Sequence, residues 1–190
     1  MALFTRVIKD FLHYVNGSCY TLIEPYLVVT TMKTERPIKQ AEEIQNWTMV
    51  FPNQANPNGN MFGGDLLAIM DTTAAMAAKR YAQQEVSTVT VEAVHFAKPF
   101  FVGDNIKVTA KVVAVGNSSM MVKAEAYKDI GYDKLEACVS AYFNLVAFDK
   151  NRLPTQVPIL ELSEDNKHDN ELALIIKTAA KQRTQLLKAQ

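Results

Sequence analysis

The run Leu66-Leu-Ala-Ile-Met-Asp-Thr-Thr-Ala-Ala-Met-Ala-Ala78 decides how this chain folds. Apolar and small residues occupy nearly every position, and Asp71 is its single charge. Because no wide polar face remains, the run predicts a helix over about 64–83 that is buried almost all round. An ionised carboxylate in such a place costs free energy unless it is hydrogen-bonded or paired, so Asp71 is a candidate catalytic group. The alternative interpretation is a solvent-exposed aspartate with no chemical role.

A turn-rich stretch, Asn56-Pro-Asn-Gly-Asn-Met-Phe-Gly-Gly64, precedes this helix. Its glycines expose backbone N–H groups at the start of the helix, where the helix dipole also favours negative charge. Such donors can stabilise the oxyanion that forms when a carbonyl group is attacked. Asn56 and Asn58 are also ordinary turn residues, so a purely structural role is the alternative for both.

Four segments after the helix have the character of β-strands. Apolar and polar residues alternate at 106–114, 120–127 and 135–147, and Val86–Phe96 is rich in valine and threonine. A further strand is predicted before the helix, at Trp47–Phe51. Because a sheet that covers an apolar helix must curl around it, the predicted fold class is α+β: a curved antiparallel sheet wrapped around a long central helix.

The two ends of the chain lie outside this pattern. The apolar spacing at 2–16 predicts a helix that ends at Gly17, followed by a connector with one short strand. Residues 163–188 predict a C-terminal helix that is acidic in its first turns and basic at its end. We expect at least one of these helical extensions to pack against another subunit or the outside of the sheet. The predicted division is an N-terminal extension at 1–43, a central domain at 44–155 and a C-terminal helix at 156–190.

The composition is that of a globular protein, and it argues against a nucleic-acid partner and a transmembrane segment. It has 190 residues, of which 48% are hydrophobic and 21% charged, and its 20 basic residues balance 20 acidic ones. That balance provides no basic surface for nucleic acid. Charges or prolines interrupt every apolar run before about 20 residues, and the N-terminus lacks the pattern of a signal peptide. We therefore expect a cytoplasmic protein without a transmembrane segment.

The cysteines and histidines show no spacing typical of a metal site. The two cysteines, Cys19 and Cys138, are far apart, and the three histidines are scattered. We expect reduced thiols, no metal and no cofactor. His95 falls in a strand pattern, and we interpret it as a packed or interface residue rather than a catalytic base.

Taken in order, these motifs resemble the signature of hot-dog-fold acyl-CoA thioesterases, in the cytosolic acyl-CoA hydrolase branch. The resemblance covers about residues 44–150. The matching segments are Asn56-Pro-Asn-Gly59, Phe62-Gly-Gly64, Met70-Asp-Thr-Thr-Ala74, Val89-Thr-Val-Glu-Ala-Val-His-Phe96, Val102-Gly-Asp104 and Val115-Gly-Asn-Ser-Ser-Met120. The resemblance implies hydrolysis of acyl-CoA to free coenzyme A and a carboxylic acid. It further implies that Asp71 acts as general base or nucleophile, that Asn56 is the other catalytic polar residue, and that the N–H of Gly64 polarises the thioester carbonyl.

The resemblance also implies that two segments contact coenzyme A, namely Val89, Thr90 and Val91, and Ser118, Ser119 and Met120. Without the resemblance, the first is only a strand and the second only a hairpin turn. A non-catalytic module that binds acyl-CoA is an alternative function, disfavoured because both Asp71 and Asn56 are present. A dehydratase on the same fold is a further alternative, disfavoured because no histidine lies near the glycine-rich stretch.

One copy of the helix cannot supply both halves of such a site. Gly64 and Asp71 are seven residues apart, so they share a helix face but lie roughly 10 Å apart along its axis. A carbonyl carbon cannot be within about 3 Å of both. We therefore predict a homodimer at minimum, or a trimer of dimers, in which Asn56 and Gly64 of one copy face Asp71 of another.

Overall fold

The computed structural model describes residues 12–15, 18–23, 26–28, 36–162 and 164–188. The chain divides into two compact units, Met1–Glu35 and Arg36–Gln190.

The N-terminal unit contains a small antiparallel sheet. Its strands are β1 (Leu12–Val15), β2 (Ser18–Ile23) and β3 (Tyr26–Val28), in the order β1-β2-β3. The predicted helix over 2–16 is therefore wrong at 12–15, and its other residues lie outside the described ones. The dipeptide Asn16-Gly17, which joins the two paired strands β1 and β2, is a strong hairpin signal that the apolar spacing outweighed in our prediction.

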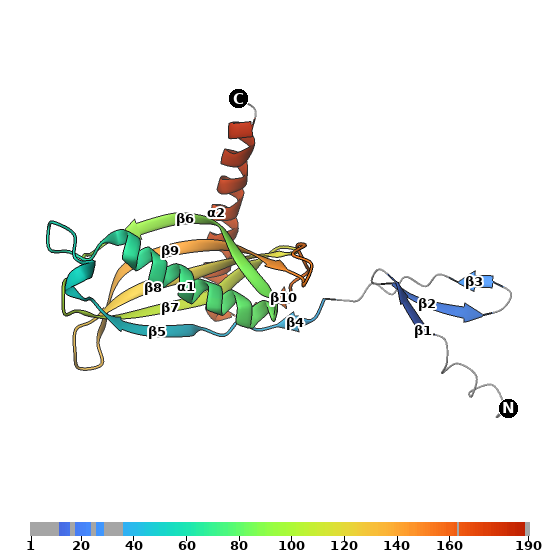
Figure 1. The fold of residues 1–190 in the computed structure, drawn as a ribbon, viewed down its shortest axis with the longest axis horizontal. Helices are drawn as coiled ribbons and strands as arrows, with labels where there is room; N and C mark the ends of the chain where they lie inside the picture. Colours follow the sequence, from blue (N-terminus) through green and yellow to red (C-terminus); the bar gives the residue numbers. More distant parts are fainter. Residues whose placement is uncertain (1–11, 16–17, 24–25, 29–35, 163, 189–190) are drawn as a thin grey trace. The chain divides into compact units, whose positions relative to one another are not determined.

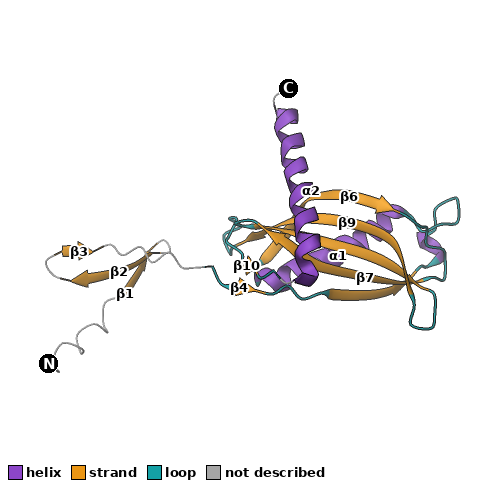
Figure 2. Ribbon diagram, turned by 180° about the vertical axis from the view of Figure 1, so that it is seen from behind, coloured by secondary structure: helices purple, strands orange, loops and turns teal. Residues whose placement is uncertain are grey.

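The second unit is built on a five-stranded antiparallel sheet. Figure 1 shows helix α1 on one face of this sheet, and Figure 2 shows helix α2 on the other. The strand order is β5-β7-β8-β9-β6, which places β5 and β6 at the edges. The strands are β5 (Ile44–Met49), β6 (Glu85–Phe96), β7 (Asn105–Val115), β8 (Ser119–Asp129) and β9 (Leu135–Phe148). The helices are the 3₁₀ turn η1 (Pro52–Gln54), α1 (Gly63–Ala82) and α2 (Glu164–Lys188).

The main core lies between α1 and the sheet. Leu66, Met70 and Ala74 on the helix pack in one cluster with inward-facing strand residues such as Phe143. Met70 and Phe143 have no exposed surface, and burying each such side chain stabilises the fold by about 1.5–3 kcal/mol. The predicted α+β architecture, a sheet wrapped on a central helix, is confirmed, and α1 begins and ends within one residue of the predicted bounds.

The prediction that this helix is buried almost all round is wrong for a single chain. Ala68, Thr72 and Met76 are exposed on the side of α1 that faces away from the sheet. The sheet covers only one side of the helix, and the described residues provide no second layer over it. Small and apolar residues therefore lie on an open face.

Residues 36–43 belong to the second unit and not to the N-terminal extension. The short strand β4 (Ile38–Lys39) pairs in parallel with β10 (Ile159–Leu160). The Arg36 guanidinium donates hydrogen bonds to the carbonyl oxygens of Val157 (2.7 Å) and Gly116 (2.7 Å). These contacts place the boundary between the units at 35/36, before the predicted one at 43/44.

The C-terminal helix packs on the outer face of the sheet, as predicted. Ala173 is fully buried there, and Asn170 Nδ2 donates to the carbonyl of Val113 at 2.8 Å. Farther along, Arg183 forms a 2.8 Å ion pair with Glu92, whose side chain is almost completely buried. Within the described residues, no helix combines the length and apolarity needed to cross a membrane.

Candidate active site

Asp71 lies on α1 where the helix faces the edge strand β6. It is half-buried, and its Oδ1 accepts a 2.7 Å hydrogen bond from Thr88 Oγ1. A charge-assisted bond of this kind offsets part of the cost of removing a carboxylate from water. Asp71 Oδ2 has no hydrogen-bond partner among the described residues, so one oxygen is held and the other is available to a ligand.

A β-bulge at Val89 gives Thr88 its orientation. Thr88 pairs with Leu145, a core residue that packs toward α1, whereas Thr90 pairs with Asn144. An extra residue in one strand changes which side chains face the helix. Thr88 therefore points at Asp71, while Thr90, only two residues later, belongs to the other face of the sheet. Thr88 was not among the predicted site residues, although it directly precedes the Val89-Thr90-Val91 motif.

Asn56 organises the loop before α1 and retains a free donor. Its Oδ1 accepts the N–H groups of Asn58 (2.9 Å) and Asn60 (3.2 Å), so the structural role expected of a turn residue is present. Its Nδ2 has no partner among the described residues. The amide can therefore hold the loop with its oxygen and offer its N–H groups to a ligand.

The start of α1 also presents free donors. The N–H groups of Asp65 and Leu66 bond to the carbonyl of Phe62, whereas those of Gly63 and Gly64 have no partner among the described residues. The ring of Phe62 lies close to the backbone here, so a side chain at position 64 would collide with it. Because glycine has no side chain, it leaves the backbone at the start of α1 uncovered at this position.

Asn56 and the helix N-terminus share a pocket of about 470 Å³. Apolar side chains form most of its remaining wall, including Met61, Leu66, Phe96, Pro99, Phe100 and Val139. Of the three predicted catalytic positions, Asn56 lines this pocket, and the helix N-terminus contributes Gly63, the neighbour of Gly64. Asp71 does not join them, because it lies two turns farther along the continuous helix α1, roughly 10 Å from Gly64.

The segments predicted to contact coenzyme A lie elsewhere. Val89 and Val91 are exposed on the edge strand β6, at 56% and 41% of their surface. Ser118 and Ser119 are half-buried at the β7–β8 turn, near the end of the sheet where α1 ends. Met120 is fully buried in the main core, so the single chain exposes no part of it to a ligand.

Among residues 36–162 and 164–188, no cluster of three or more histidine, cysteine, aspartate or glutamate residues could hold a metal ion. His95 lies on β6 opposite Ser140 and is exposed in the single chain. Cys138 is buried, and this burial raises the pKa of its thiol. That thiol is therefore a poor nucleophile.

Comparison with known proteins shows the family to which this fold belongs. Residues 58–133 match the thioesterase superfamily. An acyl-CoA thioester hydrolase of Zymomonas mobilis is 34% identical over 132 residues, which cover 68% of this chain and 88% of that protein. An acyl-CoA hydrolase of Staphylococcus aureus, solved with butyryl-CoA and coenzyme A, superposes with a TM-score of 0.76 at 29% identity, covering 80% of this chain and 96% of that one. A hexameric acyl-CoA thioesterase superposes with a TM-score of 0.73 at 27% identity, covering 78% and 97% of the two chains.

The Staphylococcus aureus enzyme has also been solved with an asparagine, an aspartate or a threonine replaced by alanine. In that chain these residues follow one another at intervals of 15 and 17 residues. The same intervals separate Asn56, Asp71 and Thr88. With the fold and the relatives in agreement, this chain belongs to the acyl-CoA thioester hydrolase family.

Proposed function

We propose that this protein hydrolyses acyl-CoA thioesters to coenzyme A and a carboxylic acid. The observation that carries the proposal is the Asp71 carboxylate, which Thr88 of the edge strand β6 holds by one oxygen while the other has no partner among the described residues. A thioester is cleaved when a nucleophile attacks its carbonyl carbon, and a fixed carboxylate can supply or activate that nucleophile. Family membership supports the choice of acyl-CoA as the substrate class.

In the proposed mechanism, the thioester oxygen lies at the start of α1. The N–H of Gly64 and Asn56 Nδ2 donate hydrogen bonds to it, which stabilise the negative charge of the tetrahedral intermediate. Asp71 either takes a proton from an attacking water or attacks the carbonyl carbon itself to form an anhydride that water then opens. The C–S bond breaks, and coenzyme A leaves as a thiolate that is protonated. These steps require no metal or redox cofactor.

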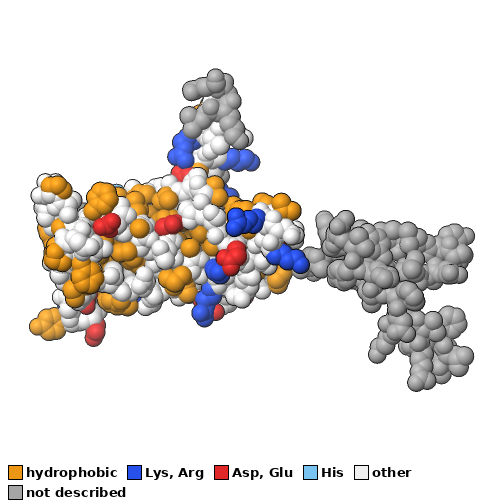
Figure 3. All heavy atoms as spheres, in the orientation of Figure 1, with side chains coloured by type: hydrophobic (Ala, Val, Ile, Leu, Met, Phe, Trp, Pro, Cys, Tyr) orange, Lys and Arg blue, Asp and Glu red, His pale blue; other side chains and the backbone are white. Residues whose placement is uncertain are grey.

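The site is proposed to form between two copies of the chain. The separation of roughly 10 Å between Gly64 and Asp71 prevents one helix from placing both groups at one carbonyl carbon. Figure 3 shows hydrophobic side chains on the face that carries α1. The exposed large apolar residues of α1, its preceding turn and β6 are Phe62, Met76, Val89, Val91, Val94 and Phe96. Exposed apolar surface of this kind marks interfaces, so we propose a homodimer with two equivalent sites.

The proposed homodimer can also be the building unit of a larger oligomer. A relative of the same fold is hexameric, and we propose that this chain likewise forms a trimer of dimers. We also propose that it works in the cytoplasm.

A free-thiol assay with acyl-CoAs of several chain lengths tests the proposed function. Wild-type protein should release coenzyme A thiol stoichiometrically with the free acid. Tight binding of acyl-CoA with no thiol release would replace this proposal with the non-catalytic binding module.

A further inference from the structure

Helix α2 crosses the outer face of the sheet and reaches the edge strand β6. Near its start, Asn170 bonds to the carbonyl of Val113 on β7, and Ala173 is buried against the sheet. Farther along, the helix contacts β6, where Arg183 pairs with Glu92 at 2.8 Å. The helix thus arrives at the edge of its own sheet at about Arg183.

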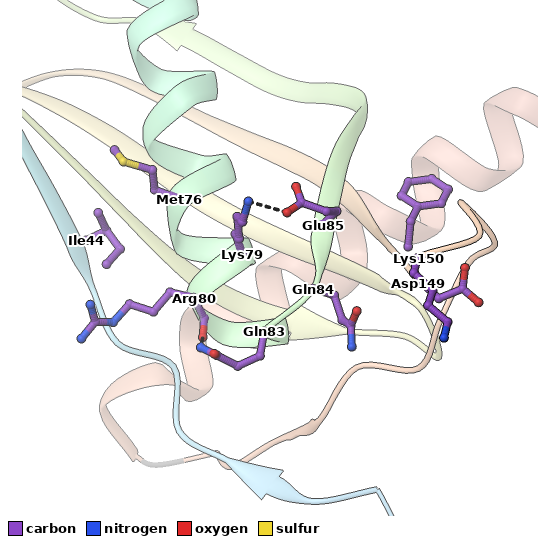
Figure 4. Close-up of a pocket in the computed structure, with 10 residues that line it drawn as sticks. Ile44, Met76, Lys79, Arg80, Gln83, Gln84, Glu85, Asp149 and Lys150 are labelled. Atoms are coloured by element: carbon purple, nitrogen blue, oxygen red, sulfur yellow. Dashed lines mark hydrogen bonds and ion pairs between the residues drawn. The ribbon is translucent and has the colours of Figure 1, made fainter. Parts of the chain in front are cut away.

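Both helices hold β6 in place at this edge. From α1, Lys79 pairs with Glu85, the first residue of β6, as Figure 4 shows. From α2, Arg183 pairs with Glu92, whose side chain is only 6% exposed. Among the described strands, however, β6 pairs only with β9, so one side of this 12-residue strand has no neighbour. A long edge strand of this kind is prone to associate with another chain.

The last turns of α2 extend beyond that edge. Figures 1 and 2 both show the C-terminal end of α2 continuing past β6. Ala180 is partly buried, and every side chain from 181 to 186 is exposed. Leu186 follows Arg183 by three residues, a rise of about 4.5 Å, which is close to the spacing of about 4.8 Å between neighbouring strands. Leu186 therefore lies about one strand past its own sheet, with 70% of its surface exposed.

Leu186 continues an apolar stripe along α2. The stripe consists of Leu172, Ile175, Ala179 and Leu186, which are all exposed in the single chain. Their spacing places them on one side of the helix, and that side is not the one through which Ala173 packs on the sheet. An exposed leucine at a helix end that has left its own sheet contributes little to the fold of one chain. Apolar surface of this kind marks a contact with another molecule.

The symmetry of the proposed homodimer determines which molecule the end of α2 meets. A two-fold dimer that closes along α1 and β6 brings the same edge of both copies together. Whatever extends past β6 on one copy then lies over the other copy, and the α2 helix of the partner arrives there from the opposite direction. We propose that the C-terminal ends of the two α2 helices lie antiparallel across the outer face of the dimer, with Leu186 of each copy packed in their contact.

This α2 contact holds the dimer together without entering the candidate active site. It lies on the outer face of the sheet, whereas Asp71 and Asn56 belong to the side that carries α1. The proposal rests on the homodimer proposed above and not on the hydrolysis of acyl-CoA. Because each shared site needs two copies, the α2 contact would also keep the sites assembled in dilute solution.

Cysteine cross-linking tests the α2 contact directly. In a Cys19→Ser background, the remaining thiol of Cys138 is buried, and a short bismaleimide should join Leu186→Cys chains into covalent dimers. Ile175→Cys is the matched control, because Ile175 belongs to the same stripe and is 66% exposed but lies eleven residues earlier, roughly 16 Å along the helix. It should give little covalent dimer. Equal yields from the two variants, or no dimer from Leu186→Cys, would overturn the α2 contact.

Leu186→Asp tests whether the contact stabilises the dimer. It should raise the dissociation constant of the dimer at least about tenfold, because a two-fold interface carries the change twice. Ile175→Asp should leave that constant unchanged. Sedimentation over a range of concentrations measures both, and circular dichroism checks that the helix remains folded. An unchanged constant for Leu186→Asp, or a hexamer that merely separates into intact dimers, would contradict the proposal.

The free-thiol assay separates the α2 contact from the proposed function. On dilution, Leu186→Asp should lose specific activity at a higher protein concentration than the wild type, while its kcat at concentrations where dimers persist should not change. Dimers that are linked through position 186 but release no thiol would support the α2 contact and overturn the hydrolase function alone. Wild-type protein that releases thiol as a monomer would overturn the homodimer and the α2 contact, but not the hydrolysis.

Discussion

Thr88 Oγ1 donates a 2.7 Å hydrogen bond to Asp71 Oδ1 and thereby ties the edge strand to the central helix at a carboxylate. The bond fixes one oxygen and leaves the other without a hydrogen-bond partner among the described residues. A carboxylate so held can act on a ligand without reorganising during the reaction, which is the condition for efficient electrostatic and acid–base catalysis.

Asp71→Asn should lower hydrolysis of the best acyl-CoA by at least about 100-fold, because the amide can neither accept the proton of water nor attack the thioester. The change is nearly isosteric, so the melting temperature should stay close to that of the wild type. The free-thiol assay and thermal unfolding measured on one preparation check both expectations. Near-wild-type turnover in this variant would mean that another group performs the chemistry.

Thr88→Ala should lower kcat about tenfold with a smaller effect on KM, because the hydrogen bond to the carboxylate is lost while the substrate contacts remain. Thr88→Ser keeps the hydroxyl and should recover most of the loss. Steady-state kinetics of the alanine and serine variants show whether the hydroxyl of Thr88 is the group that matters. If the serine variant is as impaired as the alanine variant, Thr88 acts through packing of its methyl group and not through its hydrogen bond to Asp71.

Mixing two inactive variants should restore activity if the site is shared between copies. In a heterodimer of Asn56→Ala and Asp71→Asn protomers, one site carries both changes and the other carries neither. Random pairing should therefore return about a quarter of the wild-type sites, as expected for a two-fold interface. Co-refolding at equal ratio, with heterodimers verified by mass, is the measurement. An unchanged background rate in verified heterodimers would place Asn56 and Asp71 of one copy in the same site.

Two truncations should separate the N-terminal unit from the body of the fold. Deleting 1–35 removes a separate compact unit and should spare most activity per intact dimer, even if solubility or oligomer size changes. Deleting 1–40 also removes Arg36 and strand β4, with their bonds to Val157, Gly116 and β10. The longer deletion should lower the melting temperature, because buried carbonyls lose their donors. Light scattering, thermal unfolding and the thiol assay distinguish the two. Loss of activity on removing 1–35 from a well-folded assembly would place that unit at the substrate site.

Alkaline pH should destabilise the fold through Tyr81. Its side chain is 3% exposed, and burial raises the pKa of its hydroxyl from 10.0 to about 12. The unfolded chain loses this proton first, so the stabilising contribution is complete below pH 10 and is lost as the pH rises toward 12. Across that window the stability of the wild type relative to Tyr81→Phe should fall by about 2 kcal/mol, since each pKa unit corresponds to about 1.4 kcal/mol. Denaturant unfolding at several pH values measures this; a constant difference would contradict it.

The sequence by itself determined the elements of the central fold and the position of the carboxylate. Alternating apolar residues in β7, β8 and β9 and the alanine-rich run of α1 are local patterns, and their periods identify strand and helix without knowledge of the partner surfaces. Asp71 was identifiable for the same reason, as the single charge in an apolar run. The N-terminal strands were missed because an apolar stripe at helical spacing competed with the Asn16-Gly17 turn signal.

Only the tertiary structure decided which groups meet. Thr88 reaches Asp71 because β6 packs beside α1 and a bulge at Val89 turns the strand, and neither the packing nor the bulge has a local signature in the sequence. Periodicity reports which side of its own element a residue occupies. The neighbour it meets there depends on how the elements pack, and that is set by the whole core.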